Sequence, residues 1–316
     1  MRPLQQFLQI GARAVGIDIG ARAIKVAELR RTTKGIELSR YGVAATPEAA
    51  VQNGMILDPP AAAEAIVAVL REAGIRARRV IASVSGQHVL ARILRLPPIP
   101  ENEVKQAVRW EAERHLPFPV EEAVLDTQVV GELSEDGRRQ IEVLLAAAPE
   151  PLVLTYIETL EAAGLSADAL EVSAVAMVRA LTAPAPEGVV AMVNLGASST
   201  EVAIVRDAVP QMTRTIPEGV EGSAATFETL GLQLRRSFDF YRAQDEAGHV
   251  DRIILCGGGA RFPEIDRRLA QELDVPVTIG ALPEALLISP TLDAATTSAA
   301  APQLMIAVGL ALRTLM

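Results

Sequence analysis

One short pattern occurs twice in this chain, 176 positions apart, and it constrains the fold more than any other feature. The first copy covers Val15–Val26 and the second covers Ala191–Val202. Each has an apolar run, a short polar residue (Asp18 or Asn194), one apolar residue, then Gly-Ala and a second apolar run. This order is typical of two strands joined by a tight glycine turn. The repeat predicts two related halves that face each other, with a ligand between their turns.

The composition restricts the class of protein. Half of the 316 residues are hydrophobic but only 3% are aromatic, so the core must be built from Ala, Val, Leu and Ile, as in a tightly layered α/β protein. The net charge of −9 argues against broad nucleic-acid binding, although residues 1–40 carry more Arg and Lys than Asp and Glu. The single cysteine, Cys256, excludes an internal disulfide and a cysteine-cluster zinc site, and fits a reducing compartment.

The chain shows no membrane-spanning signal at the level of sequence. No run approaches the roughly 20 apolar residues that a membrane span needs. The start, Met1–Val15, lacks the long apolar region of a signal peptide. Its Leu4, Phe7 and Leu8 leave two interpretations open, a loosely attached segment or a weak contact with a membrane or a partner.

Periodicity and turn residues predict the elements of the first half. We expect strands at 14–19, 24–30, 36–43 and 80–84 and a helix at 61–73 that ends at Gly74. A strand at 89–96, a helix at 101–116 and strands near 123–130 and 141–148, with a polar hairpin turn at 134–137, form a small inserted block. Helices at 151–163 and 173–181 follow.

The second half restarts with its own glycine turn after a Pro/Ala linker at 182–188. We expect helices at 227–244, 263–273 and 305–315, a strand at 252–256, and a low-complexity loop at 289–301. A third glycine run, Gly257–Gly259, lies between a strand and a helix. There the backbone can approach a ligand closely, near a helix N-terminus.

The glycine turns are suited to a phosphate-bearing ligand. Backbone N–H groups at such turns can surround phosphate oxygens. Asp18 would lie at the end of its strand, where a carboxylate can hold a hydrated magnesium ion, and Lys25 or Arg22 would supply positive charge. One such turn is weak evidence, because glycine turns are common in hairpins, but three in this order are stronger.

Taken together, the three turns resemble the two phosphate loops and the adenosine loop of the actin-like ATPase superfamily. Within it, the chain is similar to the PilM family of type IV pilus assembly proteins and to their division relative FtsA. The segments that carry this similarity are Gly16–Gly20, Val108–Pro119 and Arg235–Arg242. The second of them, with Glu-Ala-Glu followed by Pro-Phe-Pro, is the most specific.

The resemblance implies an α/β, actin-like (ribonuclease H-like) fold of two lobes with duplicated strand-rich sheets, flanking helices and a small inserted α+β subdomain. The implied first lobe comprises residues 14–84 and 149–187 with a C-terminal helix at 303–316. The insert comprises 85–148, and the second lobe comprises 188–302.

The family resemblance also implies ATP and Mg²⁺ as ligands, with Asp18 holding the metal through water. The implied nucleotide-binding residues are Asp18, Gly20, Ala21, Arg22, Lys25, Glu171, Asn194, Gly196, Ala197, Ser198, Gly257, Gly258, Gly259 and Arg261. Glu171 could equally be an ordinary charge at a helix start, and Arg261 an ordinary surface residue.

Two departures from the family pattern bear on activity. Asn194 stands where the second phosphate turn usually carries Asp, and an amide cannot supply the charge that helps to hold a metal or orient water. We therefore expect nucleotide binding with slow or absent hydrolysis. The connection at 219–222 is a few tens of residues shorter than in relatives, either natively or because a segment is omitted, and in relatives that region covers the base.

The helix at 101–116 has an apolar stripe of Val104, Ala107, Val108, Ala112 and Leu116. At roughly 100° per residue, Trp110 falls on the opposite side. It either packs under a neighbouring element or anchors a partner, with Arg109 and Glu113 as polar contacts or a plain solvated face. His115 lies within the stripe and is expected to be a core histidine.

Pro117-Phe118-Pro119 either stops this helix or lines a peptide groove. The family resemblance implies such a groove between the first actin-like subdomain and the insert, filled by the cytoplasmic N-terminal tail of a PilN-type inner-membrane protein. Backbone pairing and a few apolar pockets would hold the tail. The implied protein is cytoplasmic, lies at the inner face of the inner membrane through its partners, and binds no nucleic acid.

Two other functions stay open. A small-molecule kinase of the same superfamily would need a catalytic Asp between the lobes and a polar sugar pocket, for which the sequence offers no candidate. An FtsA-like filament protein would anchor itself by a C-terminal amphipathic helix after a linker, whereas this chain ends at Met316 directly after a core-like helix.

Overall fold

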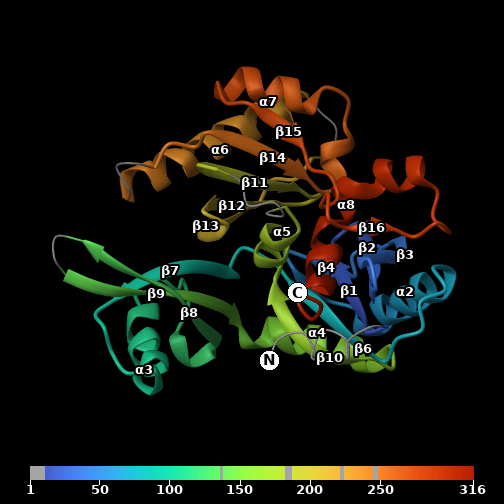
Figure 1. Ribbon diagram of the computed structural model, residues 1–316, viewed down its shortest axis with the longest axis horizontal. Coiled ribbons are helices and arrows are strands. Elements are labelled where there is room, and N and C mark those ends of the chain that lie inside the picture. Colours follow the sequence, from blue (N-terminus) through green and yellow to red (C-terminus); the bar gives the residue numbers. More distant parts are fainter. Residues whose placement is uncertain (1–10, 136–137, 182–186, 221–223, 245–247) are drawn as a thin grey trace.

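The computed structural model describes residues 11–135, 138–181, 187–220, 224–244 and 248–316. The expected linker at 182–186, the hairpin tip at 136–137, part of the short connection at 221–222 and the N-terminal Leu4, Phe7 and Leu8 lie outside these residues. Two large sheets form the frame of the molecule (Figure 1).

The first sheet has the strand order β10-β6-β1-β2-β3-β16. Its strands are β1 (Arg13–Ile19), β2 (Ala23–Thr32), β3 (Gly35–Ala45), β6 (Arg79–Val84), β10 (Ser166–Val172) and β16 (Leu287–Ile288). The helices packed on it are α2 (Pro59–Glu72), α4 (Glu150–Ala162), α5 (Ser173–Leu181) and α8 (Ala294–Leu312). We call this sheet with its helices the first lobe. A small ribbon of β4 (Val51–Gln52) and β5 (Met55–Ile56) precedes α2.

The second sheet has the order β15-β14-β11-β12-β13-β7-β9-β8. The second lobe comprises β11 (Val189–Leu195), β12 (Thr200–Arg206), β13 (Val209–Ile216), β14 (Arg252–Cys256) and β15 (Val277–Ile279), with helices α6 (Ala224–Gln244), η2 (Gly258–Arg261) and α7 (Ile265–Leu273). The insert comprises β7 (Leu90–Leu96), α3 (Glu101–Ala112), η1 (Val120–Glu122), β8 (Ala123–Glu135) and β9 (Arg138–Pro149).

The two lobes repeat one topology. β1 pairs antiparallel with β2 and parallel with β6, while β11 pairs antiparallel with β12 and parallel with β14. The order β3-β2-β1-β6-β10 therefore corresponds to β13-β12-β11-β14-β15. The prediction of a duplicated, two-lobed α/β fold is confirmed at the level of strand order.

The insert is an antiparallel three-stranded extension of the second sheet. Its β7 pairs with β13 through Met212 and Arg92, so the insert joins the second lobe as well as the first. Helix α3 buries Val104, Val108 and Ala112 against this extension, as the apolar stripe predicts. The helix ends at Ala112 rather than at 116, because the next residues form turns that close on the carbonyls of Glu111 and Ala112.

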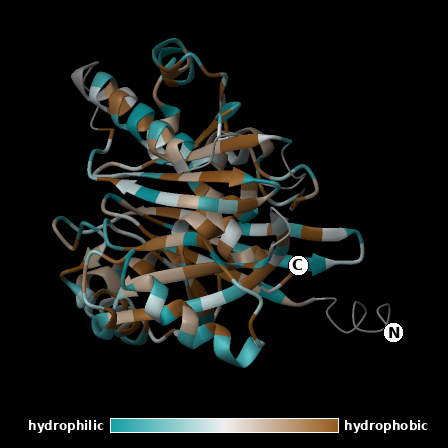
Figure 2. Cartoon of the chain, turned by 90° about the vertical axis from the view of Figure 1, so that its left-hand side faces the viewer, coloured by the Kyte–Doolittle hydropathy of each residue, from teal (hydrophilic) through white to brown (hydrophobic). Residues whose placement is uncertain are grey.

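Apolar side chains concentrate in the strands, as the brown stretches in the centre of Figure 2 show. One core cluster fills the first lobe and extends to β11, β12 and β14, a second lies within the second lobe, and a third lies beneath α8. The strands in the middle of each sheet are buried on both faces and read as continuous apolar runs, in contrast to the insert strands, which alternate.

Helix α8 and strand β10 are among the elements that differ from the sequence prediction. The expected loop at 289–301 is wrong in its second part, since α8 begins at Ala294, where the Asp293 side chain accepts from the N–H of Thr296 as an N-cap. Strand β10 was not expected, because its sequence lacks β-branched alternation. By length and composition α8 would pass as a membrane span, but 72% of its most apolar window is buried inside the protein, which makes it a core helix.

Candidate functional site

The two glycine turns have the same backbone geometry. The N–H of Gly20 donates to the carbonyl of Ala23 at 3.0 Å, and the N–H of Gly196 donates to the carbonyl of Ser199 at 3.0 Å. In each hairpin the polar residue one position before the end of the first strand faces a charged residue on the second strand. These cross-strand pairs are Asp18 with Lys25 and Asn194 with Glu201.

In the first turn, the pair is an ion pair. The Nζ atom of Lys25 lies 3.0 Å from Oδ2 of Asp18, and the hydroxyl of Ser83 donates to Oδ1 at 3.0 Å. Both charged side chains are largely buried. The first turn thus holds a carboxylate and an ammonium group side by side at the ends of β1 and β2.

In the second turn, the carboxylate belongs to Glu201 on the second strand, whereas in the first turn it belongs to Asp18 on the first strand. Nδ2 of Asn194 donates to Oε2 of Glu201 at 2.8 Å, and the hydroxyl of Ser173 donates to Oε1. Burial raises the pKa of Glu201; the donors Ser173 and Asn194 oppose this shift, while the nearby Asp18 carboxylate adds to it. The Asp18 and Lys25 charges both act on the Glu201 pKa, so the two turns lie close to each other.

Glu201 was not among the residues predicted from motifs. A signal was present, since Glu201 follows Lys25 by the same 176 positions that separate the two copies. When the two copies are aligned, the second has the acid Glu201 where the first has the base Lys25. This is the chemical difference between the two turns.

The third glycine run packs against the second turn. Gly257 has a φ of 87°, and a Cβ there would lie 2.4 Å from Oδ1 of Asn194. A Cβ at Gly259 would lie 2.8 Å from Cβ of Leu195, whereas one at Gly258 meets no heavy atom within 4 Å. Glycine is thus required at two positions by close backbone approach, and Gly258 faces open space. Burial also raises the pKa of the neighbouring Cys256 thiol.

The short connection after β13 also packs on the second turn. A Cβ at Gly219 would lie 1.9 Å from the carbonyl oxygen of Ala197, and the N–H of Val220 donates to the carbonyl of Gly196 at 2.9 Å. The Thr200 hydroxyl donates to the carbonyl of Glu218 at 2.8 Å. The described part of this connection therefore braces the turn directly.

The remaining predicted nucleotide residues divide into two groups. Ala21, Arg22 and Ser198 lie at the tips of their turns, and Arg22 and Ser198 are exposed. Glu171 and Arg261 do not join the turns. Glu171 accepts from Arg179 and Arg313 at 2.6 and 2.8 Å, and Arg261 lines a hollow of about 560 Å³ with residues of β3, α2 and the start of α8.

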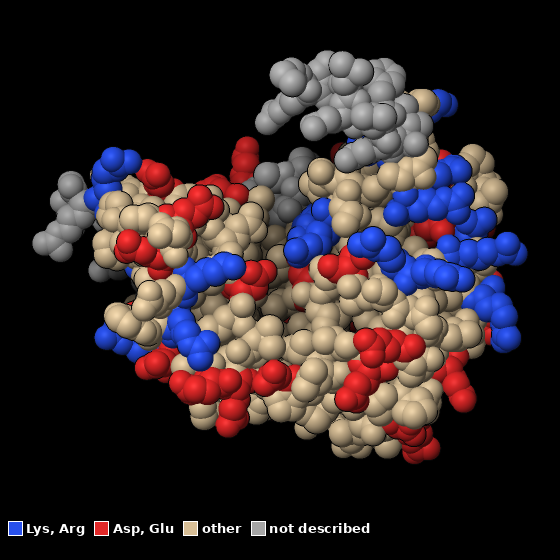
Figure 3. All heavy atoms as spheres, turned by 90° about the horizontal axis from the view of Figure 1, so that it is seen from below, with Lys and Arg blue, Asp and Glu red and all other residues tan. Residues whose placement is uncertain are grey.

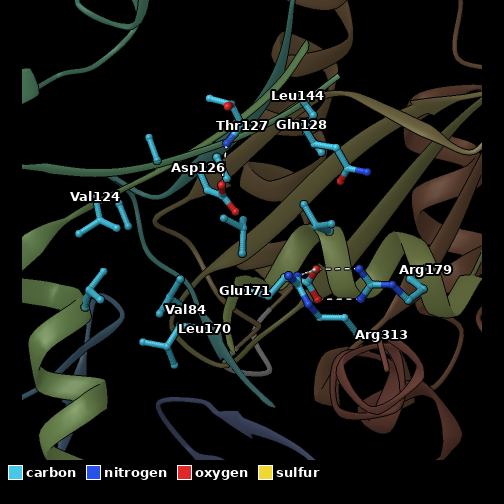
Figure 4. Close-up of a pocket in the computed structure, with 16 residues that line it drawn as sticks. Val84, Val124, Asp126, Thr127, Gln128, Leu144, Leu170, Glu171, Arg179 and Arg313 are labelled. Carbon is cyan, nitrogen blue, oxygen red and sulfur yellow. Dashed lines mark hydrogen bonds and ion pairs between the residues drawn. The ribbon is translucent and has the colours of Figure 1, made fainter. Parts of the chain in front are cut away.

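A second candidate site is a groove of about 410 Å³ between the first lobe and the insert. Leu170, Glu171 and Val172 of β10 line one side. Val124, Asp126, Thr127 and Gln128 of β8 line the other (Figure 4). Each of these strands ends the strand order of its sheet, so within the described residues the groove lies between two sheet edges.

The floor of the groove carries a compact charged cluster. Arg179 forms two hydrogen bonds with the Glu171 carboxylate and a third with the carbonyl of Gly309 at 2.9 Å. Arg313 adds a second cation to the same carboxylate (Figure 4). Apolar walls from Leu144, Ala146 and Val153 complete the groove, which thus combines backbone edges, apolar surface and paired charges.

The predicted partner residues lie elsewhere on the insert. Arg109 and Trp110 are exposed on α3 and Glu113 is exposed just after it. Trp110 has 68% of its surface accessible, so it does not pack beneath a neighbour. Pro117 and Pro119 are exposed, and Phe118 makes an edge contact with the ring of His88 at 6.2 Å. Among the described residues that line the groove, none of these six is present. His115 is half-buried beside Arg92, and burial lowers its pKa.

The duplicated sheets with facing glycine turns define a two-lobed protein of the actin-like class. The particular family follows from sequence: the model of the family described as "Type IV pilus assembly protein PilM" matches residues 16–221 and 224–315. The chain belongs to the PilM family of type IV pilus assembly proteins. The match is interrupted at the short connection.

Solved structures agree with this assignment. The chain is similar to a protein in the structure of a PilM–PilN type IV pilus biogenesis complex, with 28% identity, a TM-score of 0.84, and coverage of 96% of this chain and 98% of that one. The ethanolamine utilization protein EutJ from Carboxydothermus hydrogenoformans has 14% identity, a TM-score of 0.54 and coverage of 95% and 89%. A diol dehydratase-reactivating factor in its nucleotide-free form has 10% identity, a TM-score of 0.53 and coverage of 95% and 99%. The last two show the fold alone.

Proposed function

We propose that this chain is a cytoplasmic type IV pilus assembly factor that receives the N-terminal tail of a PilN-type inner-membrane protein in the groove between β8 and β10. The observation that carries this proposal is the position of the groove between two sheet edges. An edge strand presents unpaired N–H and C=O groups, which an extended peptide can satisfy by adding a strand. The similar protein was solved in a complex with PilN.

The groove chemistry favours an extended segment with alternating side chains. Along β8, Val124 and Asp126 face the groove with Gln128, so a paired peptide would meet an apolar residue and then a carboxylate. Apolar side chains of the tail would contact Leu144, Leu170 and Val172. A polar or charged residue of the tail would meet the Glu171 cluster. Backbone pairing supplies affinity, and these pockets supply specificity.

We also assign ATP with Mg²⁺ to the space between the two turns. The Lys25 ammonium and the exposed turn tips at Arg22 and Ser198 suit phosphate oxygens, and Asp18 suits a magnesium ion held through water. Open space at Gly258 leaves room for the sugar or base. Bound Mg²⁺ would offset phosphate charge. Because Asn194 replaces an acid, the nucleotide would bind and turn over slowly or not at all.

Calorimetry with a synthetic peptide of the partner's cytoplasmic tail tests the groove. We expect saturable binding with a dissociation constant in the micromolar range, about −8 kcal/mol. Repeating the titration with Mg-ATP tests coupling, since a nucleotide that changes the angle between the lobes must change the peptide's affinity. An absence of binding in both states, with nucleotide binding intact, would reject the adaptor function.

Two valines on β8 provide a matched pair of variants. Val124 is 44% exposed and lines the groove, whereas Val129 is 43% exposed on the same strand and does not line it. We expect Val124→Arg to weaken peptide binding at least tenfold, about 1.4 kcal/mol or more, and Val129→Arg to leave it unchanged. Equal effects would place the peptide outside the groove.

A second partner contact is proposed at the end of α3 and just after it. It comprises Arg109, Trp110, Glu113, Pro117, Phe118 and Pro119. An exposed tryptophan is unusual in a chain with 3% aromatic residues, and buried aromatic anchors dominate many interfaces. Trp110 emission should shift to shorter wavelength when the partner's full cytoplasmic segment binds. An unchanged spectrum at saturation would remove α3 from the interface without affecting the groove.

A further inference from the structure

The underside of the first lobe carries an arginine-lined hollow that neither the glycine turns nor the groove explains. The hollow has a volume of about 720 Å³. Its charged lining residues are Arg13, Arg40, Arg71, Arg76 and Arg78, which we call the arginine surface. Within the described part of the chain, no Asp or Glu lines the hollow. Figure 3 shows Lys and Arg side chains gathered over the upper part of the half of this face that the first lobe forms, with Asp and Glu side chains below them.

The charge of this arginine surface is only partly balanced. The buried carboxylate of Glu28 lies 3.7 Å from Arg13 and 3.1 Å from Arg40, so it offsets one of these two cations. Arg71, Arg76 and Arg78 are exposed and form no ion pair with any residue the structure describes. A local positive excess therefore persists on a chain whose net charge is −9.

Structural roles account for some of these arginines but not for all. Arg71 lies in the last turn of α2, where a cation interacts favourably with the helix C-terminus. The Nε atom of Arg40 approaches Gly74 just beyond that helix. Arg76 and Arg78 follow in the exposed segment that leads into β6 and have no such role. Their positive charge is therefore available to an anionic partner.

The surface is suited to phosphate headgroups rather than to nucleic acid. Its uncharged lining residues are aliphatic or glycine, such as Val67, Leu70 and Ile75, and none of the described lining residues is aromatic. Single-stranded nucleic acid is usually held by aromatic side chains that stack on bases. Arginines set among aliphatic residues instead match the charged, partly apolar boundary of an anionic bilayer.

The position of the surface agrees with this occupant. Ala163 and Leu165, at the end of α4 and before β10, line the arginine surface, and Leu170 and Val172 of β10 line the groove. From Leu165 to Leu170 the chain covers about 17 Å at roughly 3.3 Å per residue. A bilayer that touches the arginines therefore passes close to a tail that leaves the groove toward its membrane anchor.

We propose that the arginine surface, Arg13, Arg40, Arg71, Arg76 and Arg78, binds the anionic phospholipid surface of a membrane and fixes the orientation of the first lobe on it. The orientation toward the groove depends on the proposed partner function, whereas the charge complementarity does not. Binding of this kind must weaken as salt rises, because exposed charges are screened within about 10 Å at 0.1 M ionic strength.

Co-sedimentation of the full chain with lipid vesicles tests the proposal without the partner. We expect binding to vesicles that contain phosphatidylglycerol, none to vesicles of phosphatidylcholine alone, and loss of binding at high salt. The triple variant Arg71→Gln, Arg76→Gln, Arg78→Gln should lose about fivefold in affinity for each arginine, on the order of 100-fold in total.

A second triple variant is the matched control. Arg114→Gln, Arg139→Gln and Arg267→Gln remove the same charge from exposed positions on the insert and the second lobe. We expect near-normal vesicle binding by this control and normal binding of the tail peptide by both triples. Equal losses in the two triples, or no binding of the unaltered chain to anionic vesicles at low salt, would overturn the proposal. Failure of the peptide to bind would count against the partner function alone.

Discussion

The two glycine turns have one backbone and opposite chemistry. Both use the same glycine-to-carbonyl hydrogen bond at 3.0 Å, and both place a polar residue opposite a charged one across the hairpin. The first turn presents Asp18 with Lys25, an ion pair at the mouth of the hairpin. The second presents Asn194 with Glu201, a neutral amide beside a carboxylate whose pKa is raised by burial.

This difference shows that the repeat conserves geometry more strictly than charge. The fold needs the glycine turn and the buried strands on both sides of it, so these recur. The polar side chains make different contacts, Asp18 with Ser83 of its own lobe and Glu201 with Ser173 of the opposite lobe, so they can diverge. Of the two turns, the first therefore has an ion pair suited to a metal-bound phosphate, whereas the second has an amide beside a buried carboxylate.

The largest expected effect concerns packing. Gly16 corresponds to Met192 in the second copy, and a Cβ at Gly16 would lie 2.0 Å from the carbonyl oxygen of Ala307 in α8. Gly16→Ala should lower the free energy of unfolding by about 3 kcal/mol, because α8 must move away from β1. Urea unfolding measures this. Gly258→Ala, at an open position, should change stability by less than about 0.5 kcal/mol. A neutral Gly16→Ala would mean that α8 does not set this difference between the copies.

The next effect concerns the ion pair of the first turn. Asp18→Asn should weaken Mg-ATP binding on the order of 100-fold, about 2.7 kcal/mol, because the carboxylate that would hold the metal through water is lost. Calorimetry with Mg²⁺ and with a chelator separates the causes. If the loss of ATP affinity is equally large without metal, Asp18 acts by positioning Lys25 instead. Circular dichroism shows whether the variant is folded.

The reverse exchange in the second turn should harm stability rather than improve binding. Asn194→Asp places a second carboxylate beside Glu201, whose Oε2 lies 2.8 Å from the present amide. We expect a loss of about 2 kcal/mol near pH 8 and a smaller loss near pH 5, because the folded pair then retains a shared proton. Adding Glu201→Gln should relieve the repulsion in a double-mutant cycle. Additive effects would show that the two side chains are uncoupled.

The smallest effect tests the raised pKa of Glu201. The pKa of the Glu201 carboxyl group is higher in the folded state than its ordinary value of 4.5 in the unfolded state. The free energy of unfolding therefore falls as the pH rises above that ordinary pKa. Glu201→Gln removes the titration and should stabilise the protein by about 1 kcal/mol near pH 8, with a flatter pH profile. Glu132→Gln on the exposed insert is the control. A less stable Glu201→Gln at alkaline pH would contradict the assigned direction.

The sequence predicted those parts of the fold that local patterns determine. The repeat identified both glycine hairpins, and the stripe of Val104 and Val108 identified the buried side of α3 and the outward direction of Trp110. The sequence motifs did not identify Glu201 as a site residue, because a single acid within an apolar strand has no motif around it. Only its distance of 176 positions from Lys25, the spacing of the repeat, indicates that it belongs to the site.

Other features depended on contacts that no local pattern records. Strand β10 has the sequence Ser-Ala-Asp-Ala-Leu-Glu-Val, which forms a strand because β6 pairs with it in parallel. Helix α8 continues through Pro302, whose carbonyl accepts the N–H of Gly257 from the other lobe. Glu171 was predicted either to lie near the nucleotide or to be an ordinary charge at a helix start, and neither prediction included its contact with Arg313, 142 residues away.

The edge strand β8 also affects how the chain behaves on its own. A free edge can pair with the same edge of another copy as readily as with a partner. Asp126 and Glu132 are exposed along β8, and antiparallel pairing of two copies would bring these carboxylates together. We therefore expect the purified chain to resist self-association, and the double variant Asp126→Asn, Glu132→Gln to associate more readily, which light scattering would detect.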